Sequence, residues 1–207
     1  MSKHINSQQT KPDRVKSDNS RLDGHALKET IGRDKSADTL SKINEEVMNN
    51  EDIKNMYTDA KVVFGYGDGS NGIIIIGEAP SRSGGNITSE PFTSKFSGKL
   101  LSEILMNNNI RKEECFISNV CFCSPPMNGK PDMDNVILCT PYLLRAIKVI
   151  KPKKIILLGM FAKNFLEPGL KERYNVYSLC HPAYVLRRGI KETEEYKLKF
   201  KEILKND

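Results

Sequence analysis

The stretch GIIIIGEAP, residues 72–80, decides the fold. Four successive isoleucines, Ile73 to Ile76, are too few for a helix, and they place β-branched side chains on both faces of an extended segment. A strand that is apolar on both faces is typical of a parallel sheet with helices on each side. The stretch therefore predicts a buried parallel strand that ends at Gly77-Glu78-Ala79-Pro80.

The alternation of strands and helices continues toward the C-terminus. Further strands are predicted at 115–120, 154–158 and 175–179, and helices at 98–108, 135–150, 160–166 and 191–204. Four strand–helix units in series predict a three-layer αβα domain with a central four-stranded parallel sheet, because short connections place the helices on both faces.

The N-terminal part differs in composition. Residues 1–37 are polar without a periodic apolar pattern, and they predict a disordered tail. Between residues 38 and 60, Leu40, Ile43 and Val47 form a weak helical pattern that predicts a helical lead-in. The α/β domain is then expected to span residues 61–207.

The basic charge lies in one part of the chain. The formal net charge is +6, and residues 1–60 carry 10 Lys and Arg against 11 Asp and Glu, whereas residues 61–207 carry 22 against 15. A basic domain attracts polyanions, of which nucleic acid is the commonest in a cell. A solvated lysine-rich surface explains the charge equally well.

The sequence predicts an intracellular protein without a membrane partner. No stretch approaches the roughly 18 apolar residues of a membrane helix, and the N-terminus MSKHINSQQTKPDR has no apolar core of a secretory signal. Five cysteines, an odd number, fit a reducing compartment better than a disulfide scaffold.

Polar side chains stand where three of the predicted strands end. Glu78 follows the first strand, Asn119 ends the second, and His181 comes directly after the fourth. Ligands of parallel α/β sheets bind outside the carboxyl ends of the strands. A carboxylate, a carboxamide and an imidazole are therefore expected to meet on one rim.

Seven segments resemble, in order and spacing, those of uracil-DNA glycosylases of the bacterial and archaeal iron–sulfur type. They are VFGYGDG (63–69), GEAP (77–80), PF (91–92) with GKLL (98–101), ISNVCFCSPP (117–126), CTPYLLRAI (139–147), KPKKIILLG (151–159) and HPAYVLRRG (181–189). The resemblance covers about residues 61–190. It implies the fold of that family and a DNA repair reaction, hydrolysis of the N-glycosidic bond of uracil in DNA to leave an abasic site.

The resemblance also implies roles for individual residues. Phe92, which follows Pro91, would stack on the uracil ring, the alternative being a core phenylalanine. Asn119 would pair with N3–H and O4, because a carboxamide offers both an acceptor and a donor; its alternative is a structural asparagine. His181 would donate to O2 as the base leaves, a contribution of typically about 2.7–4 kcal/mol; its alternative is a structural histidine.

Other matched residues surround this set. Glu78 and Ala79 match residues that line the base pocket, although Glu78 alternatively caps the next helix or binds its backbone N–H groups. Contacts to the DNA backbone are implied for Ser124 and Pro125 and for Arg187 and Arg188. Adjacent arginines suit phosphates, which position the protein without specifying sequence. Simple surface charge is the alternative for the arginines.

One departure from the family concerns the attacking water. In the family, GEAP is usually followed by Gly, two residues and an acid that helps orient the water. Here Ser81-Arg82-Ser83-Gly84-Gly85 stands in that place, and the loop is one residue longer. Glu90, the nearest acid downstream, substitutes only if the loop folds back. Without it, base binding and His181 would sustain slow cleavage.

A second departure concerns the cofactor. The iron–sulfur type holds its cluster with four cysteines, two in a CxxC before the VFG segment and two downstream. Cys123 and Cys139 match the downstream pair, but residues 1–114 contain no cysteine. Two thiolates do not hold such a cluster, so no cofactor is expected, and both cysteines are expected to be buried apolar residues.

Two functions of different classes follow. The favoured one is a monofunctional uracil-DNA glycosylase acting on single- or double-stranded DNA, without strand cleavage because no lysine is identifiable as a Schiff-base nucleophile. The alternative is an inactive DNA-binding protein of a replication or repair complex, with the tail available to a protein partner. A third reading is a glycosylase for another pyrimidine, because the lengthened loop reshapes the pocket. Release of free uracil separates the first two.

Overall fold

The computed structural model describes residues 38–205. The predicted tail, residues 1–37, lies outside the described residues.

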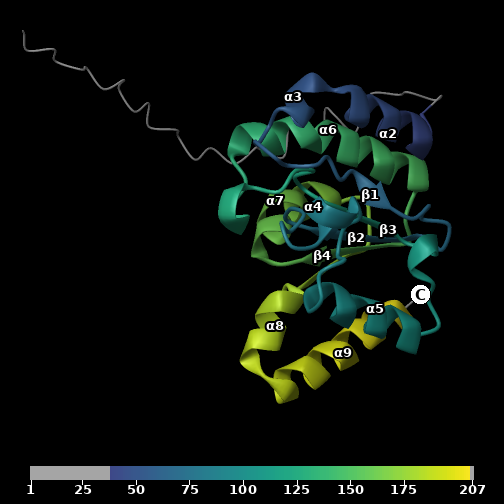
Figure 1. Cartoon of the computed structure of the whole chain (residues 1–207). Coiled ribbons are helices and arrows are strands. Elements are labelled where there is room, and N and C mark those ends of the chain that lie inside the picture. Colours follow the sequence, from purple (N-terminus) through teal and green to yellow (C-terminus); the bar gives the residue numbers. More distant parts are fainter. Residues whose placement is uncertain (1–37, 206–207) are drawn as a thin grey trace, which may run out of the picture.

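A five-stranded sheet forms the centre of the described structure (Figure 1). Its strands are β1 (Gly65–Tyr66), β2 (Ile73–Gly77), β3 (Phe116–Asn119), β4 (Lys154–Leu158) and β5 (Val176–Leu179), in the order β1-β3-β2-β4-β5. The four predicted strands are confirmed, and they run parallel. The prediction missed β1, which pairs antiparallel with β3, because a two-residue strand has too few residues for a periodic pattern.

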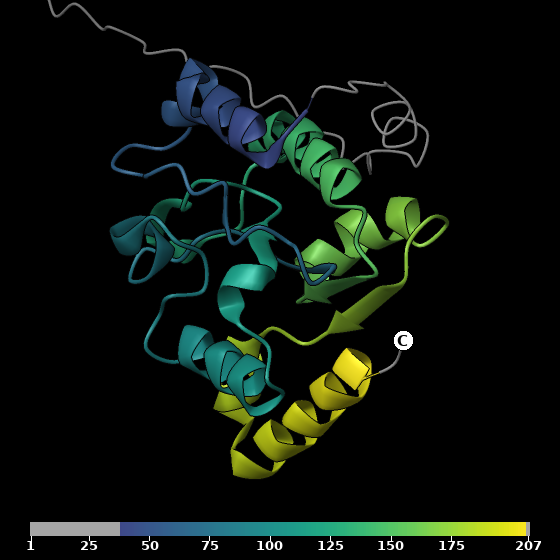
Figure 2. The same ribbon diagram turned by 90° about the vertical axis from the view of Figure 1, so that its right-hand side faces the viewer.

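Helices cover both faces of the sheet, which confirms the predicted three layers (Figures 1 and 2). One layer contains α2 (Leu40–Asn49), α3 (Glu51–Lys54), α6 (Met133–Ile150) and α7 (Met160–Leu170), and the other contains α5 (Ser97–Asn107), α8 (Pro182–Arg188) and α9 (Ile190–Lys205). Short elements complete the structure: α4 (Gly85–Thr88) and the 3-10 helices η1 (Lys112–Glu114) and η2 (Pro126–Asn128).

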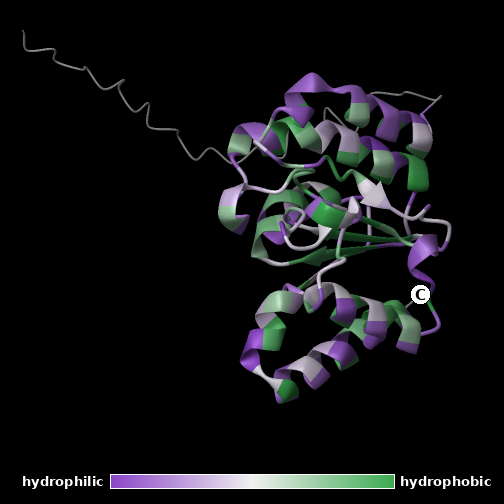
Figure 3. Ribbon diagram, in the orientation of Figure 1, coloured by the Kyte–Doolittle hydropathy of each residue, from purple (hydrophilic) through white to green (hydrophobic). Residues whose placement is uncertain are grey.

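The run of isoleucines supplies both cores. Ile74 and Ile76 pack in the core beneath α2, α6 and α7, whereas Ile73 and Ile75 pack beneath α5, α8 and α9. Figure 3 shows hydrophobic strands between helices whose outer faces are largely hydrophilic. The alternation of a strand's side chains is the reason that one short apolar run serves two layers.

The lead-in helices share the core of the α/β domain. Ile43, Val47 and Ile53 are fully buried there, so the predicted boundary at residue 61 does not separate two cores. Arg145 of α6 also forms ion pairs with the carboxylates of Asp38 and Glu46, which attach this segment to the domain. The helical pattern of this segment is weak in the sequence, yet its residues Leu40, Ile43 and Val47 all pack in or against the core.

Among residues 38–205, no helix is both long enough and apolar enough to cross a bilayer.

Candidate functional site

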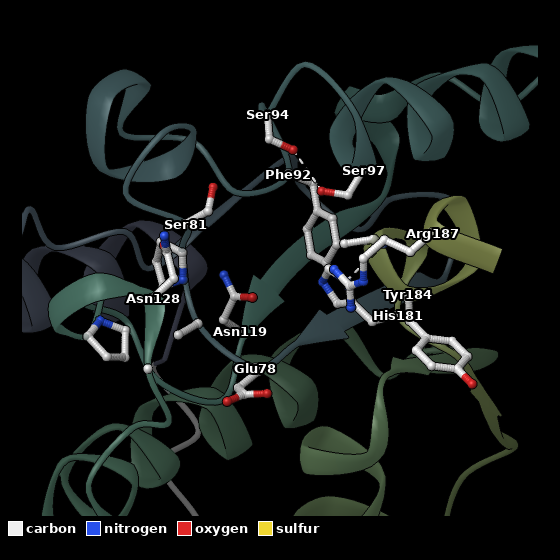
Figure 4. Close-up of a pocket in the computed structure, with 15 residues that line it drawn as sticks. Glu78, Ser81, Phe92, Ser94, Ser97, Asn119, Asn128, His181, Tyr184 and Arg187 are labelled. Atoms are coloured by element: carbon white, nitrogen blue, oxygen red, sulfur yellow. Dashed lines mark hydrogen bonds between the residues drawn. The ribbon is translucent and has the colours of Figure 1, made fainter. Parts of the chain in front are cut away.

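A pocket of about 400 Å³ opens at the carboxyl ends of β2 and β3 and beside the loop after β5 (Figure 4). Seven of the nine residues predicted for the site line it: Glu78, Ala79, Phe92, Asn119, Pro125, His181 and Arg187. The predicted meeting of a carboxylate, a carboxamide and an imidazole on one rim is therefore observed, with a phenyl ring beside them.

Gly77 makes room for two of these side chains. It ends β2 and pairs in register with Asn119 of β3. A Cβ atom at Gly77 would lie 2.6 Å from Asn119 Oδ1 and 2.8 Å from Phe92 Cζ. Because glycine has no side chain, the carboxamide and the phenyl ring lie directly against the end of the strand.

Phe92 and His181 form the aromatic part of the pocket. Their ring centroids are 5.7 Å apart, with an angle of 27° between the planes. The backbone of Phe92 is left-handed, with φ of 54°, a conformation that costs energy in a residue other than glycine. The absence of a side chain at Gly98 leaves room for this conformation, since a Cβ there would collide with the carbonyl oxygen of Phe92. Lys112 Nζ donates to the oxygen of Pro91 at 3.5 Å.

Asn119 carries a buried donor that lacks a partner. The residue is 2% exposed, and its Nδ2 has no hydrogen-bond partner among residues 38–205. Figure 4 places its carboxamide between Glu78 and the aromatic pair, within the pocket. An unsatisfied buried donor costs about 1–3 kcal/mol. The free protein therefore holds a donor that a ligand acceptor would satisfy.

His181 is prepared as a neutral donor. It is the N-cap of α8, and its Nδ1 accepts the backbone N–H of Ala183 at 3.2 Å. Burial lowers the pKa of His181 below its ordinary value of 6.5, and the charge of Arg187 acts in the same direction. With Nδ1 as an acceptor, the proton of the neutral ring is assigned to Nε2.

Glu78 is the only acid that lines the pocket within the described part of the chain. Burial raises the pKa of this carboxyl above 4.5, opposed by the charge of Lys130. Glu78 caps no helix in residues 38–205, so that alternative is wrong; the N-cap of the next helix, α4, is Gly84. Glu90 lies outside the pocket, and its charge acts on Lys112. The longer loop therefore does not bring Glu90 to the site.

The loop after GEAP is tied to the opposite wall. Arg82 donates from its backbone to Asn128 Oδ1 at 2.8 Å and from Nε to Pro125 O at 3.3 Å. Ser124 is fully buried, and its hydroxyl donates to Pro80 O at 2.7 Å. This position corrects the expected DNA contact of Ser124: the side chain joins two loops behind the pocket wall.

The two arginines lie in a helix and point to different places. Arg187 and Arg188 occupy the last turn of α8, a helix that the sequence did not predict and that begins at Pro182, directly after the His181 cap. Arg187 lines the pocket, whereas Arg188 lines a separate hollow beside α9. Both are exposed. Contact with phosphate stays a prediction for both.

Five polar lining residues that an argument from strand ends did not find lie on loops or on helices. They are Ser81, Ser94, Ser97, Asn128 and Tyr184. No spacing in the sequence distinguishes them from other polar surface residues.

The cysteines do not fit a four-thiolate cluster. Cys121, Cys123 and Cys139 are buried, yet residues 38–205 contain no group of three His, Cys, Asp or Glu side chains arranged for a metal. The Cys123 thiol donates to Ile53 O at 3.3 Å, and Cys121 Sγ lies 3.6 Å from Met56 Sδ. Burial raises the pKa of Cys123 to about 12, which favours the thiol over the thiolate ligand.

Ile53 and Met56 are three residues apart, which is the spacing of a CxxC pair. Met56 lies against Cys121 and the backbone oxygen of Ile53 against Cys123, so this segment reaches the buried cysteines without supplying a thiol.

Taken together, an aromatic stack, a buried carboxamide and a neutral imidazole at the end of a parallel sheet define a nucleobase-binding pocket. Comparison with known families identifies the class more closely, since residues 64–205 match the family described as "Uracil DNA glycosylase superfamily". The chain belongs to this superfamily, as the order of the sequence motifs indicates.

Several curated relatives carry the name type-4 uracil-DNA glycosylase. The protein from Archaeoglobus fulgidus is 32% identical, over 80% of this chain and 92% of its own. The protein from Sulfurisphaera tokodaii is 32% identical over 75% of this chain and 70% of its own, and that from Thermotoga maritima is 34% identical over 63% and 74%. The predicted resemblance to this type is confirmed.

Proposed function

We propose that the protein is a monofunctional uracil-DNA glycosylase that works without a metal cluster. The observation that carries the proposal is the buried, unpartnered Nδ2 of Asn119 beside Phe92 and His181. A base taken out of the DNA stack needs a face to lie on, groups that read its edge, and a donor for its developing charge.

Recognition of uracil follows from the carboxamide. Asn119 Nδ2 would donate to O4, and Oδ1 would accept N3–H, so the buried donor gains its partner only when the base is bound. Cytosine presents a donor and an acceptor in the reverse order at these two positions. Cytosine would place a donor against Nδ2 and an acceptor against Oδ1 of Asn119. The pocket therefore rejects cytosine through its hydrogen-bonding pattern rather than through its size.

Departure of the base follows from the imidazole. As the C1′–N1 bond breaks, its electron pair moves onto the uracil ring and negative charge builds on O2. The Nε2–H of neutral His181 would donate to that oxygen, and Phe92 would lie against the ring. A donor placed in advance stabilises this charge without reorganisation of solvent.

Glu78, the acid within GEAP, would perform the role of the acid that is missing from the loop after Pro80. Ionised Glu78 would orient a water molecule and take its proton as the water oxygen bonds to C1′. The water oxygen becomes the hydroxyl of the abasic sugar, and the uracil anion later gains a proton from solvent or Glu78. No covalent bond to the protein is formed, so the strand stays intact.

The reaction itself is the test. An oligonucleotide with one uracil is incubated with the protein, and the free base is quantified before and after alkali treatment of the strand. Release of uracil with strand scission only after alkali is the expected result. Salt-sensitive DNA binding without base release would instead favour the inactive DNA-binding protein.

The raised pKa of Glu78 predicts the acid limb of the pH profile. A general base works only when ionised, so the rate of uracil release is expected to fall as pH drops through a pKa above 4.5. Glu78→Gln is expected to slow release by about 10²-fold and to remove this limb. Glu90→Gln is the control, with rate and profile unchanged. An unaltered limb in Glu78→Gln would exclude Glu78 as the base.

The absence of a cluster is proposed from the donor set and is tested by iron content. Protein purified without oxygen is expected to contain no stoichiometric iron and to lack the visible absorption of a cluster. The double variant Ile53→Cys, Met56→Cys adds two thiols beside Cys123 and Cys121. After treatment with iron and sulfide, we expect absorption in this variant alone. Stoichiometric iron in the wild type would refute the proposal.

An intracellular location and a protein partner for residues 1–37 stay predictions from the sequence. DNA contact by Pro125, Arg187 and Arg188 likewise belongs to the proposal.

A further inference from the structure

Phe92 has a backbone conformation that residues other than glycine rarely adopt. Its φ is 54°, and such a backbone persists only where the surroundings hold it. The planar peptide group between Pro91 and Phe92 contains the Pro91 oxygen, and its orientation sets φ of Phe92. If this group turned over, φ would return to the favourable negative range and the phenyl ring would point in another direction. A hydrogen bond to the Pro91 oxygen therefore controls the direction of the ring.

Lys112 supplies that hydrogen bond. Its Nζ donates to Pro91 O at 3.5 Å, and no other donor within residues 38–205 bonds to this oxygen. Pro91 is buried and Lys112 is half-buried. A charged donor forms a stronger hydrogen bond than a neutral one. The peptide before Phe92 is thus held by an ammonium group that is partly shielded from water.

Lys112 is itself held by a different part of the chain. It lies in η1, and its Nζ stands over the ring of Tyr66 in β1, 4.7 Å from the centroid. The face of an aromatic ring attracts an ammonium group. The Tyr66 hydroxyl donates to Glu113 Oε1 at 3.1 Å, which fixes the ring beside η1. The ammonium therefore reaches the Pro91 oxygen from a fixed support.

The bonds that follow Phe92 stay within its own loop. Thr93 Oγ1 donates to Glu90 O at 3.1 Å and lies 2.6 Å from Thr88 Oγ1. Such bonds move with the loop when the loop moves. The contact from Lys112 differs from them, because it ties the peptide of Phe92 to η1 and, through Tyr66, to the sheet.

We propose that Lys112 is a positioning residue of the base pocket: braced on the Tyr66 ring, its ammonium fixes the peptide before Phe92 and keeps the phenyl ring where uracil would stack. This proposal rests on the function proposed above, in which Phe92 is the stacking face. Lys112 does not line the pocket, so its effect on the base passes through Phe92. A misplacement of about 1 Å can cost about 10²-fold in rate, so a modest shift of the ring is measurable.

Lys112→Met isolates the ammonium group. Methionine keeps an unbranched apolar stem beside Tyr66 but removes the donor and the charge. Lys99→Met is the matched control, because Lys99 lies next to Gly98 and its side chain is 74% exposed. It removes the same charge without removing a hydrogen bond to the Pro91 oxygen, so an effect of charge on DNA binding would appear in both variants.

A double-mutant cycle on single-turnover uracil release tests the route through Phe92. Lys112→Met is expected to slow release by about tenfold, and Lys99→Met by less than about twofold. Phe92→Leu removes the aromatic face, and adding Lys112→Met to it is expected to cause no further loss, because Lys112 would act only through the ring. An unchanged rate in Lys112→Met, an equal loss in Lys99→Met, or losses that multiply in the double variant would overturn the proposal.

A measurement without chemistry separates failure of this proposal from failure of the enzyme. The Phe92 ring lies against the His181 ring, so its ring current shifts the carbon-bound imidazole protons in the NMR spectrum. At about pH 8 the lowered pKa of His181 leaves the imidazole neutral. Lys112→Met is expected to move these resonances toward their positions in Phe92→Leu, and Lys99→Met to leave them unchanged.

The two readouts are independent of each other. If the wild type released no uracil yet the variants showed this NMR pattern, the positioning role of Lys112 would stand and the enzyme proposal would fall. If the His181 resonances of Lys112→Met stayed at their wild-type positions, the positioning role would fall, whatever the rates of uracil release.

Discussion

Replacing His181 with alanine is expected to slow uracil release by about 10²-fold or more. The loss follows from removal of the Nε2–H donor, which no other described side chain at the same place replaces. Single-turnover rates on a uracil oligonucleotide measure it, because they report bond cleavage rather than product release. A rate equal to that of the wild type would mean that the pocket is assigned to the wrong chemistry.

His181→Asn is the control for structure. His181 also caps α8 through Nδ1, and losing a cap costs about 1 kcal/mol of folding free energy. Asparagine is a good N-cap but does not reach as far into the pocket. We expect His181→Asn to unfold at nearly the wild-type denaturant concentration while it is as slow as His181→Ala. If His181→Asn kept wild-type activity, the slow release in His181→Ala would be due to the lost helix cap rather than to the lost Nε2–H donor.

The lowered pKa of His181 also affects stability. In the unfolded chain the imidazole takes up a proton below about pH 6.5, whereas the folded protein resists it until a lower pH. The unfolded state thus binds more protons in this window. The contribution of His181 to stability is therefore present above pH 6.5 and is lost as pH falls toward its folded pKa. The stability of His181→Asn is expected not to show this dependence on pH.

Replacing Asn119 with aspartate is expected to reduce uracil release by about 10²-fold or more. An ionised aspartate has only acceptors, so it would face O4 of uracil with a second acceptor and place an unpaired charge at a position that is 2% exposed. A protonated aspartic acid has an O–H donor and a carbonyl acceptor in the order that cytosine requires. The ratio of cytosine to uracil release is therefore expected to rise.

Base release from matched uracil and cytosine oligonucleotides measures both effects. Asn128→Asp is the control, since Asn128 also lines the pocket, is exposed, and keeps an acceptor for the backbone N–H of Arg82. We expect that variant to differ from the wild type by no more than a few-fold. An equal loss in both variants would point to the added negative charge near DNA, and wild-type discrimination in Asn119→Asp would exclude Asn119 as the reader of the base edge.

Long elements and strand ends were predictable because their signals are local. Lys154–Leu158 was predicted to the residue, since a short apolar run follows Pro152 and ends at Gly159. Loops and very short elements were not predictable in the same way. The left-handed turn at Met127 depends on hydrogen bonds to Arg82, which is distant in the chain. The DNA contact implied for Ser124 failed for a similar reason, because the side chain bonds to Pro80, which follows another strand.

The sequence on its own determined the parallel αβα sheet and the three groups at its rim. A strand that is buried on both faces, and a residue that directly follows a strand, can both be recognised from the local pattern of apolar residues. Tertiary structure alone decided that Glu90 stays outside the pocket, how closely the Phe92 ring approaches Gly77, and that Ile53 and Met56 pack against the buried cysteines. Those outcomes depend on contacts between segments far apart in the chain, whose geometry is set only when the loops close against one another.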